Sequence, residues 1–227
     1  METAVLTSVK VSTATLQDLV SRAVKGSTMV DVIPLSCLMQ VKIENKTLIV
    51  KTTDNINFLT LTAPDVDAPD FEMVVQSKLF SQLVSKLSTK DTTFEIQGNQ
   101  VVIKANGTYN IPLSTDSDGS KINFPSPEFT PNGTSYQLTN DEVRSILTLN
   151  KSCKAEMKEM PSIYNYYMDD TCVLTTNMFK GCKSNIKAFS TPVCLPPTLV
   201  DLIPVVSDES GVNVSQNETS VQFTSSK

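Results

Sequence analysis

An internal repeat constrains the fold of this chain more than any other feature of its sequence. The stretches from Phe71 to Ala105 and from Ser190 to Ser226 share one spacing of apolar residues. A shift of about 119 residues places Phe80 on Leu199, and after one inserted residue Phe94 falls on Val214. The same pattern, at low identity, covers further pairs: Leu83 and Leu202, Val84 and Ile203, Leu87 and Val206, Val101 and Val221, Ile103 and Phe223, and Leu16, Leu19 and Val20 with Val143, Ile146 and Leu147. A period of this kind indicates two copies of one structural unit.

Each copy contains the same series of strands and helices. In the first copy, Ser12 and Thr13 cap a helix over Ala14–Lys25, and Ser77 caps a second over Lys78–Lys86, with Leu79 in its buried stripe. Alternation of apolar and polar residues predicts strands near 6–11, 35–43, 47–53, 56–62, 71–75, 92–97, 100–105 and 108–113. Gly98-Asn99 is typical of a hairpin turn. The predicted class is α+β, with two helices against antiparallel sheets in each copy.

The second copy begins after a segment rich in Pro, Gly and Asp. Residues 116–133 show no apolar periodicity, which predicts a connector between a first domain at 1–115 and a second at 134–227. Thr139-Asn140 caps the first helix of the second domain, and Pro196-Pro197 starts its second. Pro204 should kink or shorten that second helix.

The composition argues against an enzyme and against a bound metal or cofactor. The 227 residues include no histidine, so the commonest general base and metal ligand is missing. The five cysteines form no CxxC pair, and no GxSxG or glycine-rich phosphate loop is found. Asp169-Asp170 is interpreted as a turn between strands. We therefore predict a chain that is not an enzyme and needs no cofactor.

The ends and apolar runs of the chain predict a cytoplasmic protein. Met1–Val5 has neither the basic nor the apolar region of a signal peptide, and no apolar run approaches the length of a membrane span. The cysteines are then expected to be free thiols in a reducing compartment, the cytoplasm of a bacterium or an infected cell.

The chain resembles the bacterial-type DNA sliding clamps, the beta-subunit family of replicative DNA polymerase. The resemblance rests on Ile33–Asn55 (IPLSCLMQVKIENKTLIVKTTDN), on ANGTYNIPLSTD, and in the second copy on CVLTTN and VQFTSS. It implies a ring around duplex DNA that tethers the polymerase without reading sequence. Bacterial members have three such domains, whereas this chain has two.

The charges on the predicted helices agree with this implied function. Segments 12–25, 77–90, 139–154 and 196–206 carry eight bases and four acids, an excess of +4 on a chain whose net charge is −5. A positive helical layer attracts phosphate, while the acidic remainder repels nonspecific contact. The alternative is that these bases simply occupy the solvated faces of helices. The predicted DNA-binding residues are Arg22, Lys25, Lys78, Lys86, Lys90, Arg144, Lys151 and Lys154.

The resemblance also implies partners and an assembly. Residues after the Thr-Asp position of the family's second domain help to bind short peptides of polymerases and clamp loaders, which points here to Thr176, Met178 and Phe179. From the residues alone, a loop with a buried Phe179 is the alternative. Tyr164, Tyr166 and Tyr167 are interpreted as half core and half sheet surface; the alternative is a cluster that stacks on bases or rims a peptide pocket.

The family's ring closes with six domains, so two per chain predict a homotrimer joined through edge strands. Two alternatives stay open. One is a truncated three-domain clamp, and the other is a β-rich phage structural or assembly protein, which paired helices in each unit disfavour.

Overall fold

The computed structural model describes residues 8–28, 34–156 and 163–226 and divides into two compact units. Unit 1 is Met1–Ser126 and unit 2 is Pro127–Lys227. The division falls inside the segment expected to be a connector. The first part of that segment packs with unit 1, because Phe124 is buried and the Lys51 ammonium donates to the Ser126 hydroxyl (3.1 Å). No helix in these described residues has the length and apolar character that a membrane crossing requires.

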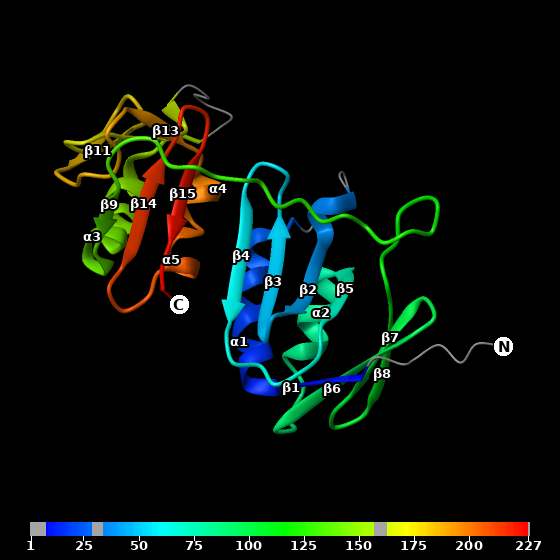
Figure 1. Cartoon of the computed structure of the whole chain (residues 1–227). Coiled ribbons are helices and arrows are strands. Elements are labelled where there is room, and N and C mark those ends of the chain that lie inside the picture. The colour runs from blue at the N-terminus through cyan, green and yellow to red at the C-terminus, as the bar shows by residue number, and fades with distance from the viewer. Residues whose placement is uncertain (1–7, 29–33, 157–162, 227) are drawn as a thin grey trace. The chain divides into compact units, whose positions relative to one another are not determined.

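Unit 1 contains two four-stranded antiparallel sheets (Figure 1). The first has the order β1-β6-β7-β8, formed by Ser8–Ser12, Asp91–Gln97, Gln100–Lys104 and Thr108–Pro112. The second has the order β4-β3-β2-β5, formed by Phe58–Ala63, Thr47–Thr53, Leu38–Glu44 and Phe71–Gln76. Gln97 pairs with Gln100, so Gly98 and Asn99 form the predicted hairpin turn. The predicted strand at 35–43 is wrong at its start, because Pro34–Cys37 forms a 3-10 helix before β2.

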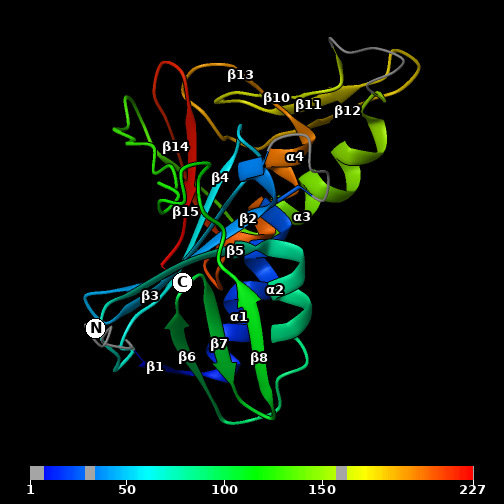
Figure 2. The ribbon, with the colours of Figure 1, turned by 90° about the vertical axis from the view of Figure 1, so that its right-hand side faces the viewer.

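Two helices of unit 1 run side by side against these sheets (Figure 2). Helix α1 (Thr13–Ala23) is shorter than predicted and continues as a 3-10 turn over Val24–Gly26, while α2 spans Ser77–Val84. Leu16, Leu19, Val20 and Ala23 of α1 are buried, as their helical spacing predicts. The prediction that Leu79 is buried is wrong: it is 43% exposed. Helix α2 buries Phe80 instead, whose ring lies 6.3 Å from that of Phe94.

Unit 2 repeats the strand order of unit 1. Its sheets are β15-β14-β9 (Val221–Thr224, Val212–Gln216 and Tyr136–Leu138) and β12-β11-β10-β13 (Gly181–Ser184, Val173–Thr176, Tyr166–Met168 and Val193–Leu195). Strand by strand these match β7-β6-β1 and β4-β3-β2-β5, while β8 has no counterpart in the described residues. The topology confirms the duplication that the apolar spacing predicted.

The helices of unit 2 are less regular than those of unit 1. Helix α3 (Asn140–Ser145) continues as a π-helical segment over Ile146–Asn150 and a 3-10 turn over Lys151–Cys153. The predicted second helix is divided into α4 (Pro197–Val200) and α5 (Ile203–Val206). Pro204 lies at the start of α5, where a missing amide proton costs no helical hydrogen bond. Because proline cannot lie in the interior of a longer helix without breaking it, the helix is shorter, as predicted. A core that includes Tyr166 and Phe189 packs beneath them.

One glycine in unit 2 tests this packing. Gly211 has φ 105° in the turn before β14, and a Cβ there would lie against the Leu138 carbonyl oxygen. Gly211→Ala should destabilise unit 2 by about 2 kcal/mol or more, because it adds a backbone clash to the strain of positive φ. Gly119→Ala is the control, since Gly119 has φ 82° with nothing within 4 Å of the added atom. Urea denaturation followed by circular dichroism measures both, and equal losses would contradict the clash.

Candidate functional site

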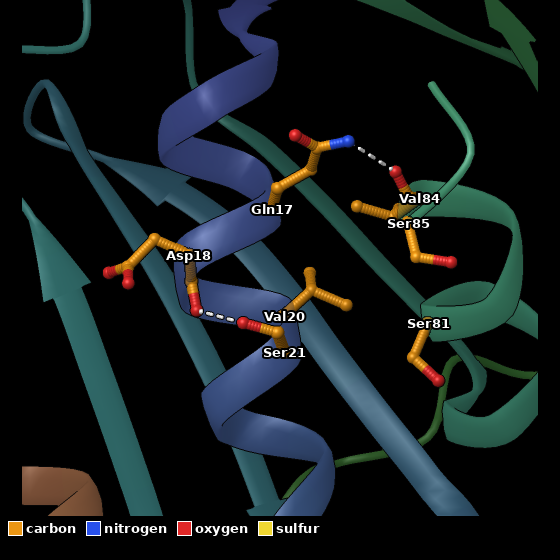
Figure 3. A pocket seen from close by; sticks show the side chains of 7 residues that line it. All are labelled: Gln17, Asp18, Val20, Ser21, Ser81, Val84 and Ser85. Atoms are coloured by element: carbon orange, nitrogen blue, oxygen red, sulfur yellow. Dashed lines mark hydrogen bonds between the residues drawn. The ribbon is translucent and has the colours of Figure 1, made fainter. Parts of the chain in front are cut away.

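The two helices of unit 1 are fixed to each other by part-buried hydrogen bonds and to a sheet by a buried one. The Thr52 hydroxyl of β3 donates to the Ala23 carbonyl at the end of α1 (2.7 Å). The Gln17 side-chain amide of α1 donates to the carbonyl of Val84 at the end of α2 (2.9 Å, Figure 3) and to that of Leu87 just beyond it (2.9 Å). Gly26 permits the close approach of β3 to the end of α1, because a Cβ at this position would lie 2.6 Å from the Thr52 hydroxyl. We call the exposed side of α1, α2 and the turns that follow them the unit 1 helical layer.

A groove of about 330 Å³ lies between α1 and α2. It is lined by Gln17, Asp18, Val20, Ser21, Ser81, Val84 and Ser85 (Figure 3). Each serine hydroxyl donates to a carbonyl of its own helix, as Ser21 does to Asp18. The groove therefore presents uncharged hydroxyl oxygens, with Asp18 as its one ionisable side chain.

The structure places five of the eight predicted DNA-binding residues on this layer. Lys25, Lys78, Lys86 and Lys90 are exposed. Arg22 is less accessible to solvent: its side chain is 15% exposed, and its guanidinium lies 3.0 Å from the Asp18 carboxylate. The structure thus places these five cations on two neighbouring helices and the turns that follow them.

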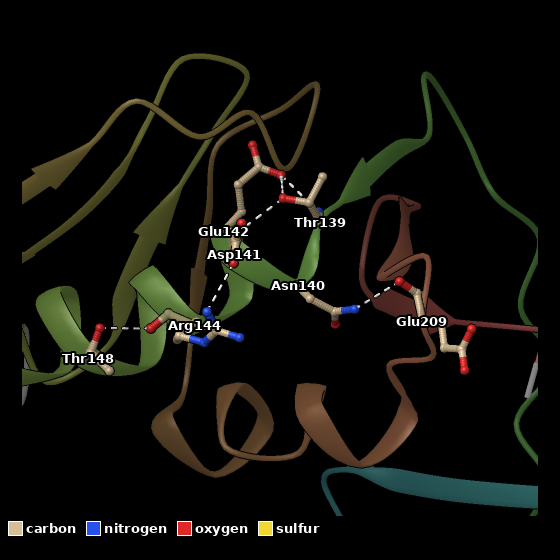
Figure 4. A network of polar contacts seen from close by, with 7 residues as sticks. All are labelled: Thr139, Asn140, Asp141, Glu142, Arg144, Thr148 and Glu209. Carbon is tan, nitrogen blue, oxygen red and sulfur yellow. Dashed lines mark hydrogen bonds and ion pairs between the residues drawn. The ribbon is translucent and has the colours of Figure 1, made fainter.

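The other three predicted residues lie on α3 and in the turn that follows it, and each contacts an acidic or aromatic side chain. Arg144 pairs with Asp141 one turn earlier (3.0 Å, Figure 4), and Lys151 pairs with Asp201 between α4 and α5 (2.7 Å). The Lys154 ammonium lies 4.7 Å from the centre of the Tyr164 ring, a cation–π contact.

Polar groups fix the start of α3 in place. The Thr139 and Glu142 side chains form a reciprocal capping box (Figure 4). The Asn140 side chain donates to the carbonyl of Glu209 (3.1 Å, Figure 4) and to that of Asp208 (2.8 Å). At the far end, Asn150 is buried and its carbonyl accepts from the Thr175 hydroxyl of β11 (2.7 Å). We call the exposed side of α3, α4 and α5, with the turn after α3, the unit 2 helical layer.

The predicted partner-binding residues form the turn between β11 and β12. The Thr176 hydroxyl accepts from the Met178 amide and donates to the Lys180 carbonyl (3.0 Å each). Met178 has φ 72°, and Phe179 is 97% exposed. The alternative of a buried Phe179 is therefore wrong, and the turn presents two apolar side chains to solvent.

The sequence reasoning missed that unit 1 has the same turn. The Thr53 hydroxyl accepts from the Asn55 amide (2.9 Å) and donates to the Asn57 carbonyl (2.7 Å), and Asn55 has φ 74°. Here Ile56 takes the place of Phe179 and is 79% exposed. The signal was the shared pair of threonines before an Asp or Asn, Thr52-Thr53-Asp54 and Thr175-Thr176-Asn177.

The tyrosine cluster and Asp169 of unit 2 take part in packing and in turn structure. Tyr166 is fully buried, which raises its pKa to about 12, whereas Tyr167 is half-buried and donates to the Asp169 carboxylate (2.8 Å). The Thr171 hydroxyl and the amides of Cys172 and Thr171 hold the pKa of Asp169 well below its ordinary value. Asp169 closes the turn from β10 to β11, as predicted, and a carboxyl held ionised in this way is a poor general acid. The described residues contain no cluster of three Cys, Asp or Glu that could hold a metal.

Comparison with protein families gives one match. The model of the DNA polymerase III beta subunit, N-terminal domain, matches residues 7–120, just over half of the chain. No curated protein sequence matches.

Solved structures resemble the whole chain. The DNA polymerase III beta subunit of Thermotoga maritima has a TM-score of 0.79 at 15% identity, over 96% of this chain and 62% of its own. The DNA polymerase sliding clamp of Bacillus subtilis has a TM-score of 0.79 at 15% identity, over 97% and 62%. That of Bartonella birtlesii, bound to griselimycin, has 0.80 at 16%, over 96% and 62%. At these identities the likeness shows the fold, and the chain spans 62% of the length of these structures.

The exposure of Phe179 predicts that its loss leaves stability unchanged. Phe179→Ala should alter the free energy of unfolding by less than about 0.5 kcal/mol, because the ring makes little contact with the fold. Phe189→Ala is the matched control: its ring is 1% exposed, and truncation should cost about 3–5 kcal/mol. Urea denaturation measures both, and a large loss for Phe179→Ala would place its ring in a core.

Proposed function

Since this chain belongs to the DNA polymerase III beta-subunit family, the sliding clamps, we propose that it is a processivity factor that encircles duplex DNA and tethers a polymerase. Sliding clamps are non-enzymatic, in agreement with a chain that lacks histidine and any catalytic constellation in its sequence. The observation that carries the proposal is the duplication. Both units set two helical elements against antiparallel sheets in the same strand order, and unit 1 presents cations from those helices.

Contact with DNA in this proposal is electrostatic and independent of sequence. Lysine and arginine on helices reach phosphate oxygens, which carry no base information. Binding should therefore be weak and steeply dependent on salt. The alternative, a β-rich structural protein of a phage, explains neither the paired helices nor the family match.

The polymerase and clamp loader are proposed to bind through short peptides at the β11–β12 turn. Thr176 shapes this turn, and Met178 and Phe179 supply exposed apolar surface for a peptide anchor. We propose that the protein acts in the cytoplasm of a bacterial or infected cell.

The ring is proposed to form from three chains joined head to tail through edge strands. Strand β8 is an edge of its sheet in unit 1, and β12 is an edge in unit 2. The Leu113 amide donates to the Asn99 carbonyl of the hairpin, so by antiparallel alternation Asn110 directs its own amide away from β7. Such an open donor can extend a sheet into a neighbouring chain.

Light scattering at high protein concentration tests this assembly. The wild-type chain should show a threefold mass, and Asn110→Pro should show a monomer because it removes an edge donor from β8. Asn110→Ala keeps the amide proton and should remain a trimer. A wild-type monomer at every concentration would contradict the ring of three and favour a truncated three-domain clamp.

A further inference from the structure

The two helical layers differ in charge. In unit 1, segments 12–25 and 77–90 contain five bases and one acid. In unit 2, segments 139–154 and 196–206 contain three bases and three acids. The whole excess of +4 on the helical segments therefore belongs to unit 1, and the unit 2 layer is neutral.

The cations of unit 1 are available to an outside anion. Asp18 is the one acid of these segments, and it lies against Arg22. Lys25, Lys78, Lys86 and Lys90 are exposed, and no ion pair joins them to an acid in the described parts of the chain. The groove between the helices adds hydroxyl groups and no further acid. Phosphate could approach this layer without displacing a carboxylate from any of the four lysines.

The cations of unit 2 already have partners. Arg144 and Lys151 each lie within 3.0 Å of a carboxylate oxygen, and Lys154 lies over an aromatic ring. A phosphate that approached Arg144 or Lys151 would also approach Asp141 or Asp201. Exposed ion pairs are weak and can exchange. The unit 2 layer nevertheless has no net charge, so it lacks the long-range attraction that draws a positively charged surface to DNA.

We propose that the unit 1 layer alone supplies the electrostatic hold on DNA, through Lys25, Lys78, Lys86 and Lys90, while the unit 2 layer contributes no net attraction. In a ring of several chains, charged and neutral layers would then alternate. This inference rests on the proposed function, because it divides the DNA contact of that function between the two units.

Three full-length variants test the division. Lys78→Gln, Lys86→Gln and Lys90→Gln together remove three charges from the unit 1 layer. Lys46→Gln, Lys121→Gln and Lys187→Gln remove the same number of charges from exposed lysines outside both helical layers, none of which lies in β8, in β12 or in the β11–β12 turn; we call this the control variant. Asp141→Asn, Arg144→Gln, Lys151→Gln and Asp201→Asn remove both ion pairs of unit 2 at constant net charge. Circular dichroism checks that each variant folds.

The measurement is fluorescence anisotropy of a labelled linear duplex of arbitrary sequence, titrated with protein over a series of salt concentrations. The unit 1 variant should bind at least about tenfold more weakly at low salt, and the slope of log K against log salt should become shallower by about 0.9 for each phosphate that the variant no longer neutralises. The control variant and the unit 2 variant should bind within about twofold of the wild-type chain and keep its salt slope.

The outcomes separate the inference from the proposed function. An equal change of slope in the unit 2 variant would overturn the one-sided hold and leave the clamp function standing. An equal change in the control variant would show that overall charge, not the unit 1 layer, governs binding, and would also overturn the inference. A wild-type chain that fails to bind the duplex at low salt would overturn the proposed function and the inference together.

Discussion

A buried threonine hydroxyl fixes the first helical element of each unit to its sheet, and the rest of the site depends on it. Thr52 donates to the Ala23 carbonyl and Thr175 to the Asn150 carbonyl, both at 2.7 Å. Both threonines are at most 2% exposed, so neither carbonyl would find water in place of the hydroxyl. An unsatisfied buried group costs about 1–3 kcal/mol. This bond sets where α1 and α3 lie on their sheets, and hence where their charged side chains point.

The residue that follows each of these two threonines helps to form the turn at the end of the same strand. Thr53 and Thr176 accept an amide proton from two residues ahead, and the following Asp54 or Asn177 accepts two more. Three consecutive residues thus secure a helix on one side of the strand and close an apolar-tipped turn at its end. Because the same three residues must both bind the helix and form the turn, the two copies agree in sequence here, although most of their similarity lies only in apolar spacing.

The strands and most buried positions could be predicted because burial follows the period of each element. Two of the predictions were wrong because the apolar pattern at those positions fits more than one local structure. Leu35 and Cys37 continue the alternation of β2, but Pro34 has a fixed φ suited to a helical turn, and a 3-10 helix forms instead. Leu79 neighbours Phe80 on α2, a helix of 8 residues. Consecutive helical residues lie about 100° apart, and the buried stripe of α2 runs through Phe80 and Val84, so Leu79 lies at the edge of that stripe, toward solvent.

The candidate site was less accessible to sequence reasoning, because pairing is a tertiary property. Helical spacing correctly placed Lys78 and Lys86 on an exposed face. It gave no warning that Lys151 meets Asp201, fifty residues later, or that Lys154 meets a tyrosine. A charge count over helical segments treats all eight bases alike. Attraction of a polyanion depends on the cations that remain after neighbouring acids are included. The Arg144–Asp141 pair lies within one helical turn and follows from helical spacing, but only the fold shows partners far along the chain, such as Asp201 for Lys151.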